Sequence, residues 1–576
     1  MSNAPVVKRW TLLPDGDSEL VDSLTQQLGI ERKLANMLVQ RGVKTFEEAR
    51  SFFRPSLSEL HDPYLMKDMN KAVDRILLAL ESDETIMIYG DYDVDGTTSV
   101  ALLYSFFREL CPERLHFYIP DRYAEGYGVS FRGIDVAEEL GCTLIIALDC
   151  GIRSVDKVDY AANKGIDFII CDHHLPGSEV PKASAVLDPK QSDCAYPYKE
   201  LCGCGIGFKL IQALKQVLPH AGDTDHWLDL VATAIAADIV PITGENRILA
   251  YFGMLQINTK PRPGIRMLLR SGKDGANSNP TKEFSISDLV FTAAPRINAA
   301  GRIDHGKKAV ELLITENEST AEEILSHINT QNVKRKDLDQ LMTSEALAIL
   351  DSNELYRDVK STVLFKNDWH KGVVGIVASR VMEKYYRPTI ILTESNGKAT
   401  GSARSVKGFD VHEAISACAD LLEQFGGHKY AAGMTLPLEN VEAFRQRFEE
   451  IVAETIQEES LVPVVDIDME LELSDITPKF YRIMKQFAPF GPGNMSPVFL
   501  TKHLQDDGYG KIVGTHHLKL KLGKSGQPSF DAIAFGMAHM HPAISKGIPV
   551  DVCYTLEENH WNGKVNLQWM VKDMRC

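Results

Sequence analysis

The spacing of apolar and polar residues divides this chain into segments of different character. From about residue 20 to 82, apolar positions recur at three- and four-residue steps, as in LVDSLTQQL and MNKAVDRILLAL, which predicts helices. Three short apolar runs follow, TIMIYG, TLIIAL and DFIIC, and polar residues follow each of them. Segments of helical character separate these runs, so the pattern predicts βαβ units and a mostly parallel sheet.

The rest of the chain adds three further patterns. Residues 318 to 351 form a long polar stretch without Pro or Gly, which predicts a connecting helix, and a second α/β region follows. Towards the end, alternating runs such as HLKLKLG and FDAIAFG predict a small barrel or sandwich, for which an OB barrel is one candidate. We therefore expect an α/β protein with these parts: an N-terminal helical segment (1–82), a parallel-sheet domain (83–317), a connecting helix (318–351), a smaller α/β domain (352–457) and a β-rich, OB-like domain (458–576).

Composition and charge narrow the class of protein only slightly. The 44% hydrophobic and 24% charged residues are typical of soluble globular proteins, and no apolar run reaches the roughly 20 residues of a membrane span. The ten cysteines lack metal or redox spacing, and the N-terminus lacks a secretion signal, so we expect reduced thiols and a cytoplasmic protein. A net charge of −17 argues against a simple basic clamp on nucleic acid but leaves the partner open.

Three acidic residues alternate directly after the first apolar run. Asp91, Asp93 and Asp95 in GDYDVDG would share one face of an extended segment, and a tight turn would bring them to one point. Like charges that close repel one another unless a cation neutralises them. The pattern therefore predicts a metal site, and an Asp-rich turn or a helix N-cap is the alternative.

Further candidate ligands lie at the ends of other apolar elements. Asp149 closes the second predicted strand, His173 and His174 close the third, and Asp238 follows an apolar helix. Ligands of parallel sheets bind beyond the carboxyl ends of the strands, so we expect these side chains to face one crevice. Mixed Asp and His ligands suit Mn²⁺, Mg²⁺ or Zn²⁺, and a pair of ions indicates phosphoester or phosphoanhydride hydrolysis.

Taken together, these motifs resemble a known family. DYDVDG, LDCGI, CDHH and the segment around Asp238 are similar to the four motifs of the DHH phosphoesterase superfamily. APRINAAGR, HKGVVGIVASR, GSARS and FGGHKYAAGM extend the resemblance over essentially the whole chain to the RecJ family, whose DHHA1-type domain matches the last three. The resemblance implies 5′-to-3′ hydrolysis of single-stranded DNA to mononucleotides with two Mn²⁺ or Mg²⁺ ions, in DNA repair, mismatch repair and recombination. It also implies two protein partners, single-strand-binding protein and a RecQ-type helicase.

The resemblance assigns roles to the candidate residues by motif position. The implied metal ligands are Asp93, Asp95, Asp149, His173 and Asp238. Asp149 would bridge the two ions, and Asp91 and Asp172 would support the ligands by orienting them. His174 would complete the catalytic set by touching either the scissile phosphate or a metal, and these two roles stay open.

A second set of residues is implied to bind DNA. Guanidinium groups match phosphate in two-point contacts, and glycine-rich turns expose backbone N–H groups to an anion. A solvated surface charge or a structural salt bridge is the alternative for each arginine. The set consists of Arg302, Arg380, Ser402, Arg404, Gly426, Gly427 and His428. In the C-terminal strands, Lys519, Lys521 and Trp569 are either DNA contacts or part of the barrel.

Two rival functions remain at this point. A DHH-family hydrolase of short oligonucleotides or cyclic dinucleotides would share the motifs, but the additional N-terminal and C-terminal regions favour a polymeric substrate. A non-catalytic DNA-binding relative would be expected to lose ligands, and all the expected carboxylates and histidines are present.

Overall fold

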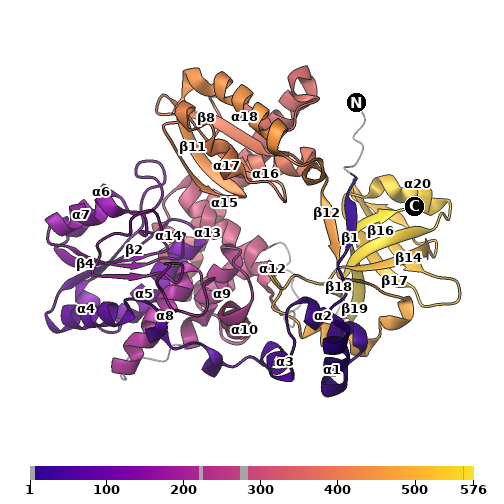
Figure 1. The fold of residues 1–576 in the computed structure, drawn as a ribbon, viewed down its shortest axis with the longest axis horizontal. Coiled ribbons are helices and arrows are strands. Elements are labelled where there is room, and N and C mark those ends of the chain that lie inside the picture. Colours follow the sequence, from indigo (N-terminus) through magenta and orange to yellow (C-terminus); the bar gives the residue numbers. More distant parts are fainter. Residues whose placement is uncertain (1–6, 219–224, 273–282, 562–563) are drawn as a thin grey trace.

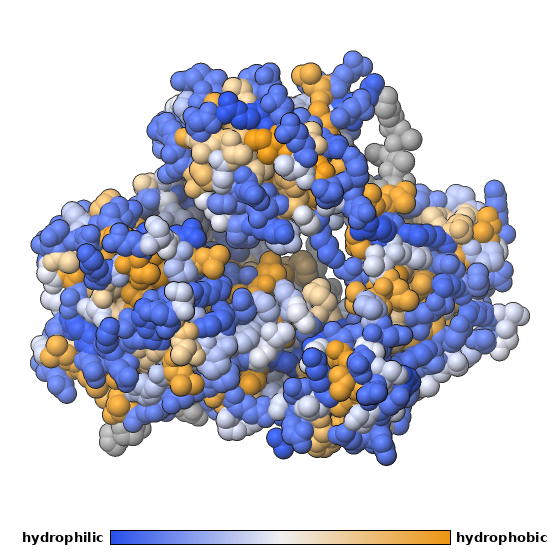
Figure 2. Space-filling model, in the orientation of Figure 1, coloured by the Kyte–Doolittle hydropathy of each residue, from blue (hydrophilic) through white to orange (hydrophobic). Residues whose placement is uncertain are grey.

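Three bodies, each built on its own sheet, form the molecule. The computed structural model describes residues 7–218, 225–272, 283–561 and 564–576. Figure 1 shows a parallel-sheet domain (indigo to magenta), a middle domain (orange) and a C-terminal domain (mainly yellow). The surface is hollowed where the three bodies meet (Figure 2).

The parallel-sheet domain contains five strands in the order β3-β2-β4-β5-β6, and every pairing is parallel. This confirms the mostly parallel sheet that the three apolar runs predict. Both faces of the sheet are covered by helices, which explains why the strands are continuous apolar runs. The strands are β2 (Thr85–Gly90), β3 (Leu115–Tyr118), β4 (Cys142–Leu148), β5 (Asp167–Cys171) and β6 (Ala185–Leu187).

Alternate residues of these strands enter two different cores. Ile86 and Ile88 point to the larger core, whereas Met87 and Tyr89 point to the smaller one. The helices on the larger side are α4 (Met69–Glu81), α5 (Val94–Arg108) and α8 (Gly203–Val217). Those on the smaller side are α6 (Phe131–Glu139) and α7 (Val155–Asn163).

Further helices extend the larger core and lead to the middle domain. They are α9 (Leu228–Ala237), α10 (Gly244–Thr259), α11 (Pro263–Arg270), α12 (Ile286–Asp288), the π-helix η5 (Leu289–Ala293), α13 (Ala294–Ile303) and α14 (Lys307–Ile314). The polar stretch after them forms one long helix, α15 (Glu318–Ser352). Its first half packs on the parallel-sheet domain and its second half on the middle domain.

The middle domain has a mixed sheet in the order β10-β11-β9-β8-β7, in which only β7 and β8 are parallel. Its strands are β7 (Thr362–Phe365), β8 (Thr389–Ser395), β9 (Lys398–Arg404), β10 (Gln424–His428) and β11 (Ala431–Pro437). One side of the sheet carries α15 and α16 (Val374–Tyr385). The other side carries α17 (Val411–Ser416) and α18 (Val441–Thr455).

The C-terminal domain is a seven-stranded sheet that an additional pairing between β14 and β16 curls into a barrel. The strands are β13 (Met469–Glu470), β14 (Phe499–Asp506), β15 (Lys511–Val513), β16 (His517–Gly523), β17 (Phe530–Ala534), β18 (Val550–Trp561) and β19 (Lys564–Arg575). Two helices accompany them, α19 (Pro478–Lys485) and α20 (His541–Ser545). The alternating C-terminal pattern therefore forms the small barrel that it predicts.

The N-terminal segment predicted as helical, residues 1–82, is divided between two bodies. It begins with a strand, β1 (Arg9–Leu12), which pairs in parallel with β12 (Val464–Ile467), and residues 1–6 lie outside the described residues. The next helices, α1 (Ser18–Leu28), α2 (Arg32–Gln40) and α3 (Phe46–Phe53), pack against the C-terminal barrel. The helix α4 joins the parallel-sheet domain, together with Leu57, Leu60, Tyr64 and Met66 of the segment before it. The apolar pattern predicts the helices but contains no information on which core they join.

Cysteine chemistry and membrane segments add two smaller findings. All ten cysteines are free thiols, and every one except Cys576 is buried. Within the described ranges, no helix combines the length and the apolar character that a bilayer crossing needs.

Candidate metal centre

Three neighbouring strands of the parallel sheet lead directly into the candidate metal centre. Asp91 follows β2, Asp149 follows β4, and Asp172, His173 and His174 follow β5. Because the carboxyl ends of parallel strands lie at one edge of the sheet, these side chains meet there. Asp149 has a left-handed backbone with φ of 59°, which Asp tolerates better than most residues other than glycine.

His173 lies in the middle of a group of carboxylates. Its Nε2 atom is 3.1 Å from Asp149 Oδ1, 3.6 Å from Asp238 Oδ2 and 3.8 Å from Asp95 Oδ2. Two groups of three residues could each hold a metal ion, because the donor atoms within each group lie within 4.8 Å of one another. One group is Asp95, His173 and Asp238, and the other is Asp149, His173 and His174. The structure thus brings together five of the predicted residues from four separate elements.

The donor atoms at this centre fit a divalent cation. Both ring nitrogens of His173 are buried without a hydrogen-bond partner, and so is one carboxylate oxygen each of Asp91 and Asp149. Burial, followed by the charge of His174, lowers the pKa of His173 to about 3, so its ring is neutral at pH 7. A neutral imidazole among carboxylates is a ligand set for Mn²⁺ or Mg²⁺, and a cation would satisfy His173 Nε2 and the Asp149 carboxylate.

The first turn of α8 holds Asp95 in place. Asp95 Oδ2 accepts a hydrogen bond from the Gly203 N–H at 2.6 Å, and Oδ1 accepts one from the Cys204 N–H at 2.8 Å. Burial and the charge of Asp93 nevertheless raise the pKa of Asp95 to about 7. The helix N-terminus therefore orients this carboxylate, and a cation is needed to keep it ionised.

Asp91 and Asp93 lie beside the two donor sets rather than inside them. Asp93 caps α5 by accepting a hydrogen bond from the Gly96 N–H at 3.0 Å. Asp91 is fully buried and accepts a hydrogen bond from the Gly128 N–H at 3.0 Å. Burial, followed by the charge of Asp93, raises the pKa of Asp91 well above its usual range. The ligand role of Asp93 and the supporting role of Asp91 stay predictions.

Asp172 is the best-satisfied carboxylate of the centre. It accepts hydrogen bonds from the N–H groups of Ile152, His173 and His174 at 2.9, 2.8 and 3.1 Å, and from His174 Nδ1 at 2.7 Å. Burial opposes its ionisation, but the hydrogen bond and charge of His174 hold the pKa of Asp172 below the usual range. Burial likewise opposes protonation of His174, while Asp172 raises the pKa of His174 to about 9. The two groups form an ion pair that orients the His174 ring.

A loop outside the recognised motifs, residues 121–130, covers one side of the centre. Tyr127 Oη lies 3.4 Å from His174 Nε2, and the neighbouring Gly128 donates its N–H to Asp91. Gly126 and Gly128 both have positive φ, of 90° and 82°, so the bend needs glycine. The available signal in the sequence is EGYG, a Tyr between two glycines.

Asp188 is a second feature that the recognised motifs do not include. It directly follows β6, is completely buried, and one of its oxygens has no hydrogen-bond partner. Burial raises the pKa of Asp188 to about 7. The run AVLD repeats the pattern of an apolar strand followed by Asp that identifies Asp149, so the sequence contains the signal.

Three arginines gather beside the centre. The Arg122 guanidinium stacks on the Tyr92 ring at 4.8 Å, and Arg302 Nη1 donates to the Gly372 carbonyl at 3.2 Å. Burial, then the charges of Arg122 and Arg404, lowers the pKa of Arg302 to about 9. In the described part of the chain, none of these three arginines has an acidic partner within ion-pair distance. We call Arg122, Arg302 and Arg404 the arginine cluster.

The other predicted DNA-binding residues divide into two groups. Ser402 Oγ accepts a hydrogen bond from Arg404 Nη1 at 2.9 Å, so it belongs with the cluster. Gly426, Gly427 and His428 are exposed on β10. Arg380 instead forms an ion pair with Asp339 of α15 at 3.2 Å, the structural salt bridge considered as its alternative.

The candidate DNA contacts of the C-terminal domain also differ from one another. Trp569 is completely buried, and its ring stacks on Tyr554 with centroids 3.7 Å apart. Trp569 is therefore a core residue and is not available to stack on a base. Lys519 is exposed and Lys521 is half-buried on β16, so both stay candidates.

Gly203→Ala should disrupt the metal centre. An added Cβ would lie 2.7 Å from Asp149 Cβ and 2.9 Å from its Cα, so Asp149 or α8 must move. We expect at least about tenfold weaker Mn²⁺ binding by titration calorimetry, as for other changes that displace a ligand. Gly205→Ala is the matched control, because its nearest contact would be an ordinary 3.4 Å to Leu201. Equal losses in both variants would contradict the prediction.

Comparison with known proteins agrees with this geometry. Three regions match family models: the DHH family N-terminal domain (85–235), the DHHA1 domain (358–454) and the RecJ OB domain (467–573). The single-stranded-DNA-specific exonuclease RecJ of Bacillus subtilis is 39% identical and covers 98% of this chain and 70% of its own. RecJ of Escherichia coli is 33% identical over 94% and 95% of the two chains. The crystal structure of RecJ from Thermus thermophilus in complex with Mn²⁺ has a TM-score of 0.83 at 27% identity, covering 99% of this chain and 79% of that one.

The fold and the metal centre define a protein of the DHH class that carries a DHHA1 domain. Relatives of 33% and 39% identity extend over almost the whole chain, including the C-terminal barrel. The chain belongs to the RecJ family.

Proposed function

We propose that this protein is a 5′-to-3′ exonuclease that degrades single-stranded DNA to mononucleotides with two Mn²⁺ or Mg²⁺ ions. The observation that carries the proposal is a neutral His173 surrounded by three carboxylates at 3.1 to 3.8 Å, directly beside an unneutralised arginine cluster. The carboxylates can bind metal ions, and the guanidinium groups can bind the phosphate of a phosphodiester held by those ions.

The arginine cluster supplies the contacts to the DNA backbone. Its guanidinium groups come from two domains, Arg122 and Arg302 from the parallel-sheet domain and Arg404 from the middle domain. Burial, followed by the charges of Arg404 and His174, lowers the pKa of His428, so this residue of β10 lies within electrostatic range of both the arginine cluster and His174. A strand lying between the two domains would thus have phosphates within reach of both.

Each protein group has a separate task in hydrolysis. Asp93, Asp95, Asp149, His173 and Asp238 would hold the two ions, and Asp149 would be the ligand common to both. Bound ions of this kind supply a water of lowered pKa and stabilise the charge that develops at phosphorus. His174, protonated and held by Asp172 through Nδ1, would offer its Nε2–H, which lies 3.4 Å from Tyr127 Oη, to the scissile phosphate. Asp91 orients the loop at Gly128.

The proposal extends to the cellular setting of the enzyme. Ten free thiols, nine of them buried, fit a reducing compartment, so we place the enzyme in the cytoplasm. A role in repair, mismatch repair and recombination is part of the proposal, as the resemblance to the RecJ family implies. Single-strand-binding protein and a RecQ-type helicase are proposed partners, and a pull-down that retains neither would contradict them.

End-labelled substrates test the reaction. Purified protein is incubated with single strands labelled at the 5′ or 3′ end, with duplex and with RNA, in Mn²⁺ or EDTA. We expect metal-dependent release of labelled mononucleotide from the 5′ end of single-stranded DNA. Cleavage of very short oligonucleotides alone would indicate the small-substrate hydrolase, and tight binding without cleavage in Mn²⁺ would indicate a non-catalytic DNA-binding relative.

Arg404→Ala should weaken DNA binding more than it slows chemistry. One charge-assisted contact is worth about 1.5 to 3 kcal/mol, so we expect KM to rise about 10- to 100-fold, with a smaller change in kcat. Arg447→Ala removes the same charge from the surface of the same domain, where Arg447 pairs with Asp420, and should leave KM unchanged. If both variants raise KM equally, general charge rather than the cluster binds the strand.

A further inference from the structure

The segment directly after Asp238 contacts the C-terminal domain. Asp238 ends α9, and the next residue, Ile239, has a left-handed backbone with φ of 60° that turns the chain away. Ile242 is buried, and its N–H donates to the carbonyl of Pro492 at 2.7 Å. Only three residues therefore separate a candidate metal ligand from a hydrogen bond to another domain.

The packing at this contact leaves no free space. A Cβ added at Gly491 would lie 2.5 Å from Ile242 Cδ1, and one added at Gly493 would lie 2.8 Å from Thr243 Cγ2. Because both positions are glycine, the backbone at Gly491 and Gly493 contacts the side chains of Ile242 and Thr243 directly. A shift of residues 491–493 is thus transmitted directly to residues 242–243.

Arg247, in the first turn of α10, fixes the same segment a second time. Its guanidinium donates to the carbonyls of Phe487 at 2.9 Å, Ala488 at 3.1 Å and Phe52 at 2.8 Å. It also stacks on the Phe52 ring at 3.8 Å and is only 6% exposed. Burial lowers the pKa of Arg247 to about 10, which leaves it charged at neutral pH. One buried cation therefore ties α10 to the C-terminal domain and to α3.

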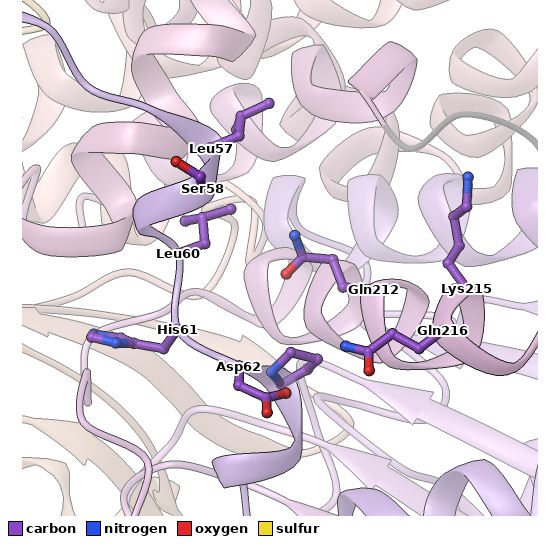
Figure 3. A pocket seen from close by; sticks show the side chains of 9 residues that line it. Leu57, Ser58, Leu60, His61, Asp62, Gln212, Lys215 and Gln216 are labelled. Carbon is purple, nitrogen blue, oxygen red and sulfur yellow. The ribbon is translucent and has the colours of Figure 1, made fainter. Parts of the chain in front are cut away.

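The other side of this turn is anchored on the parallel-sheet domain. Glu245 accepts hydrogen bonds from Tyr196 Oη at 2.7 Å, from the His61 N–H at 2.9 Å and from the completely buried Lys209 at 3.2 Å. Figure 3 shows His61 in the segment between α3 and α4, which runs past Gln212 of α8, and both residues line a cavity. The first turn of α10 is held from both domains.

Asp238 differs from the other carboxylates in how it is positioned. Asp95 and Asp172 are held by backbone N–H groups, and the side chains of Asp95 and Asp149 are each 2% exposed. The Asp238 side chain is 28% exposed, and no hydrogen bond to its carboxylate is found among the described residues. Its position is set by its own backbone, which the hydrogen bond from the Asp238 N–H to the Ala234 carbonyl at 2.9 Å fixes to α9 on one side and residues 239–242 fix on the other.

We propose that residues 241–247 and 487–494 form a junction through which the C-terminal domain holds Asp238 in the metal-binding position. Arg247 and Ile242 are positioning residues, because they act on the metal through the backbone at Asp238. The inference rests on the proposed metal site. It adds that the affinity for one of the ions depends on how the C-terminal domain packs against residues 241–247. Loosening the junction should weaken that ion's binding without removing any ligand.

Calorimetric titration of the full chain with Mn²⁺ tests the junction. Displacing an orienting group commonly costs about 10- to 100-fold in metal affinity, so we expect at least about tenfold weaker binding of one ion in Arg247→Ala and in Gly491→Ala. Activity of both variants should return towards the wild-type level at saturating Mn²⁺. Arg387→Ala is the matched control, since Arg387 is an equally buried arginine bonded to backbone carbonyls of the middle domain. It should lose stability but keep wild-type Mn²⁺ affinity.

The outcomes separate the junction from the metal site itself. Unchanged Mn²⁺ affinity in Arg247→Ala, or in Gly491→Ala if the first variant does not fold, would overturn the junction. A loss of the same size in Arg387→Ala would also overturn it, because general destabilisation would then explain the effect. Absence of Mn²⁺ binding to the wild-type protein would instead overturn the proposed function.

Discussion

Replacing Asp149 by Asn should abolish nuclease activity and at the same time stabilise the metal-free protein. Asp149 is buried, one of its oxygens lacks a partner, and its Oδ1 is the carboxylate atom nearest to His173 Nε2. Losing a shared metal ligand removes several kcal/mol of charge stabilisation, so we expect kcat to fall by a factor on the order of 10³ or more. Asn is chosen because it tolerates the left-handed φ of 59° that Ala would strain.

The gain in stability follows from the titration of Asp149. Burial, followed by the charge of Asp95, raises its pKa in the folded protein well above that of the unfolded chain. A carboxyl with a raised folded pKa contributes stability below about pH 4 that is lost as pH rises, and a pKa difference of one corresponds to about 1.4 kcal/mol. In EDTA, the Asp149→Asn variant should therefore match the wild-type Tm near pH 4 and exceed it at pH 8.

Differential scanning calorimetry in EDTA at both pH values measures this difference. Asp156→Asn is the control, because Asp156 is exposed on α7, where it pairs with Lys157. Mn²⁺ should raise the Tm of the wild-type protein and of the control but have little effect on the Asp149→Asn variant. A lower Tm for Asp149→Asn in EDTA at pH 8 would show that the ionised Asp149 does not destabilise the metal-free protein.

The sequence predicts those parts of the fold that depend on local pattern. Strands β2, β4 and β5 are buried on both faces, so their apolar runs are continuous and easy to identify, and the parallel order follows from the helices between them. The pairing of β1 with β12 joins residues more than 450 positions apart. No local pattern in four residues indicates such a partner, which is why the pattern predicts a wholly helical N-terminal segment.

The candidate site shows the same division between local and long-range information. Asp149, His173 and Asp238 lie at the ends of apolar elements, and that shared position makes them candidate ligands in the sequence. The groups that hold Asp95 are the backbone N–H atoms of Gly203 and Cys204, which lie more than 100 residues away and have no side-chain signature. Metal ligands are encoded by residue type, whereas their orientation is encoded by the backbone of distant segments.

Asp172→Asn should have the opposite effect on stability, although Asp172 is equally buried. The four hydrogen bonds to Asp172 come from N–H groups on both of its oxygens. Whichever way the Asn amide is turned, its NH₂ group faces a donor, and the protonated His174 loses its partner. Removing one member of a fully buried ion pair costs about 3 to 5 kcal/mol, and solvent around the His174 side chain, which is 42% exposed, reduces this cost, so we expect a smaller but clear drop in Tm and a large drop in kcat.

The pH dependence of this loss distinguishes an ion pair from simple packing. Asp172 has a lowered folded pKa, so its contribution is present above the unfolded value near 4 and is lost as pH falls further. His174 has a folded pKa raised to about 9, so its contribution is complete below about pH 6.5 and is lost as pH rises through 9. The Tm difference between wild type and Asp172→Asn should therefore be largest between about pH 4 and 6.5 and should shrink on both sides. A difference that does not vary from pH 3 to 10 would mean that the carboxylate acts by shape alone, and that His174 needs no charged partner.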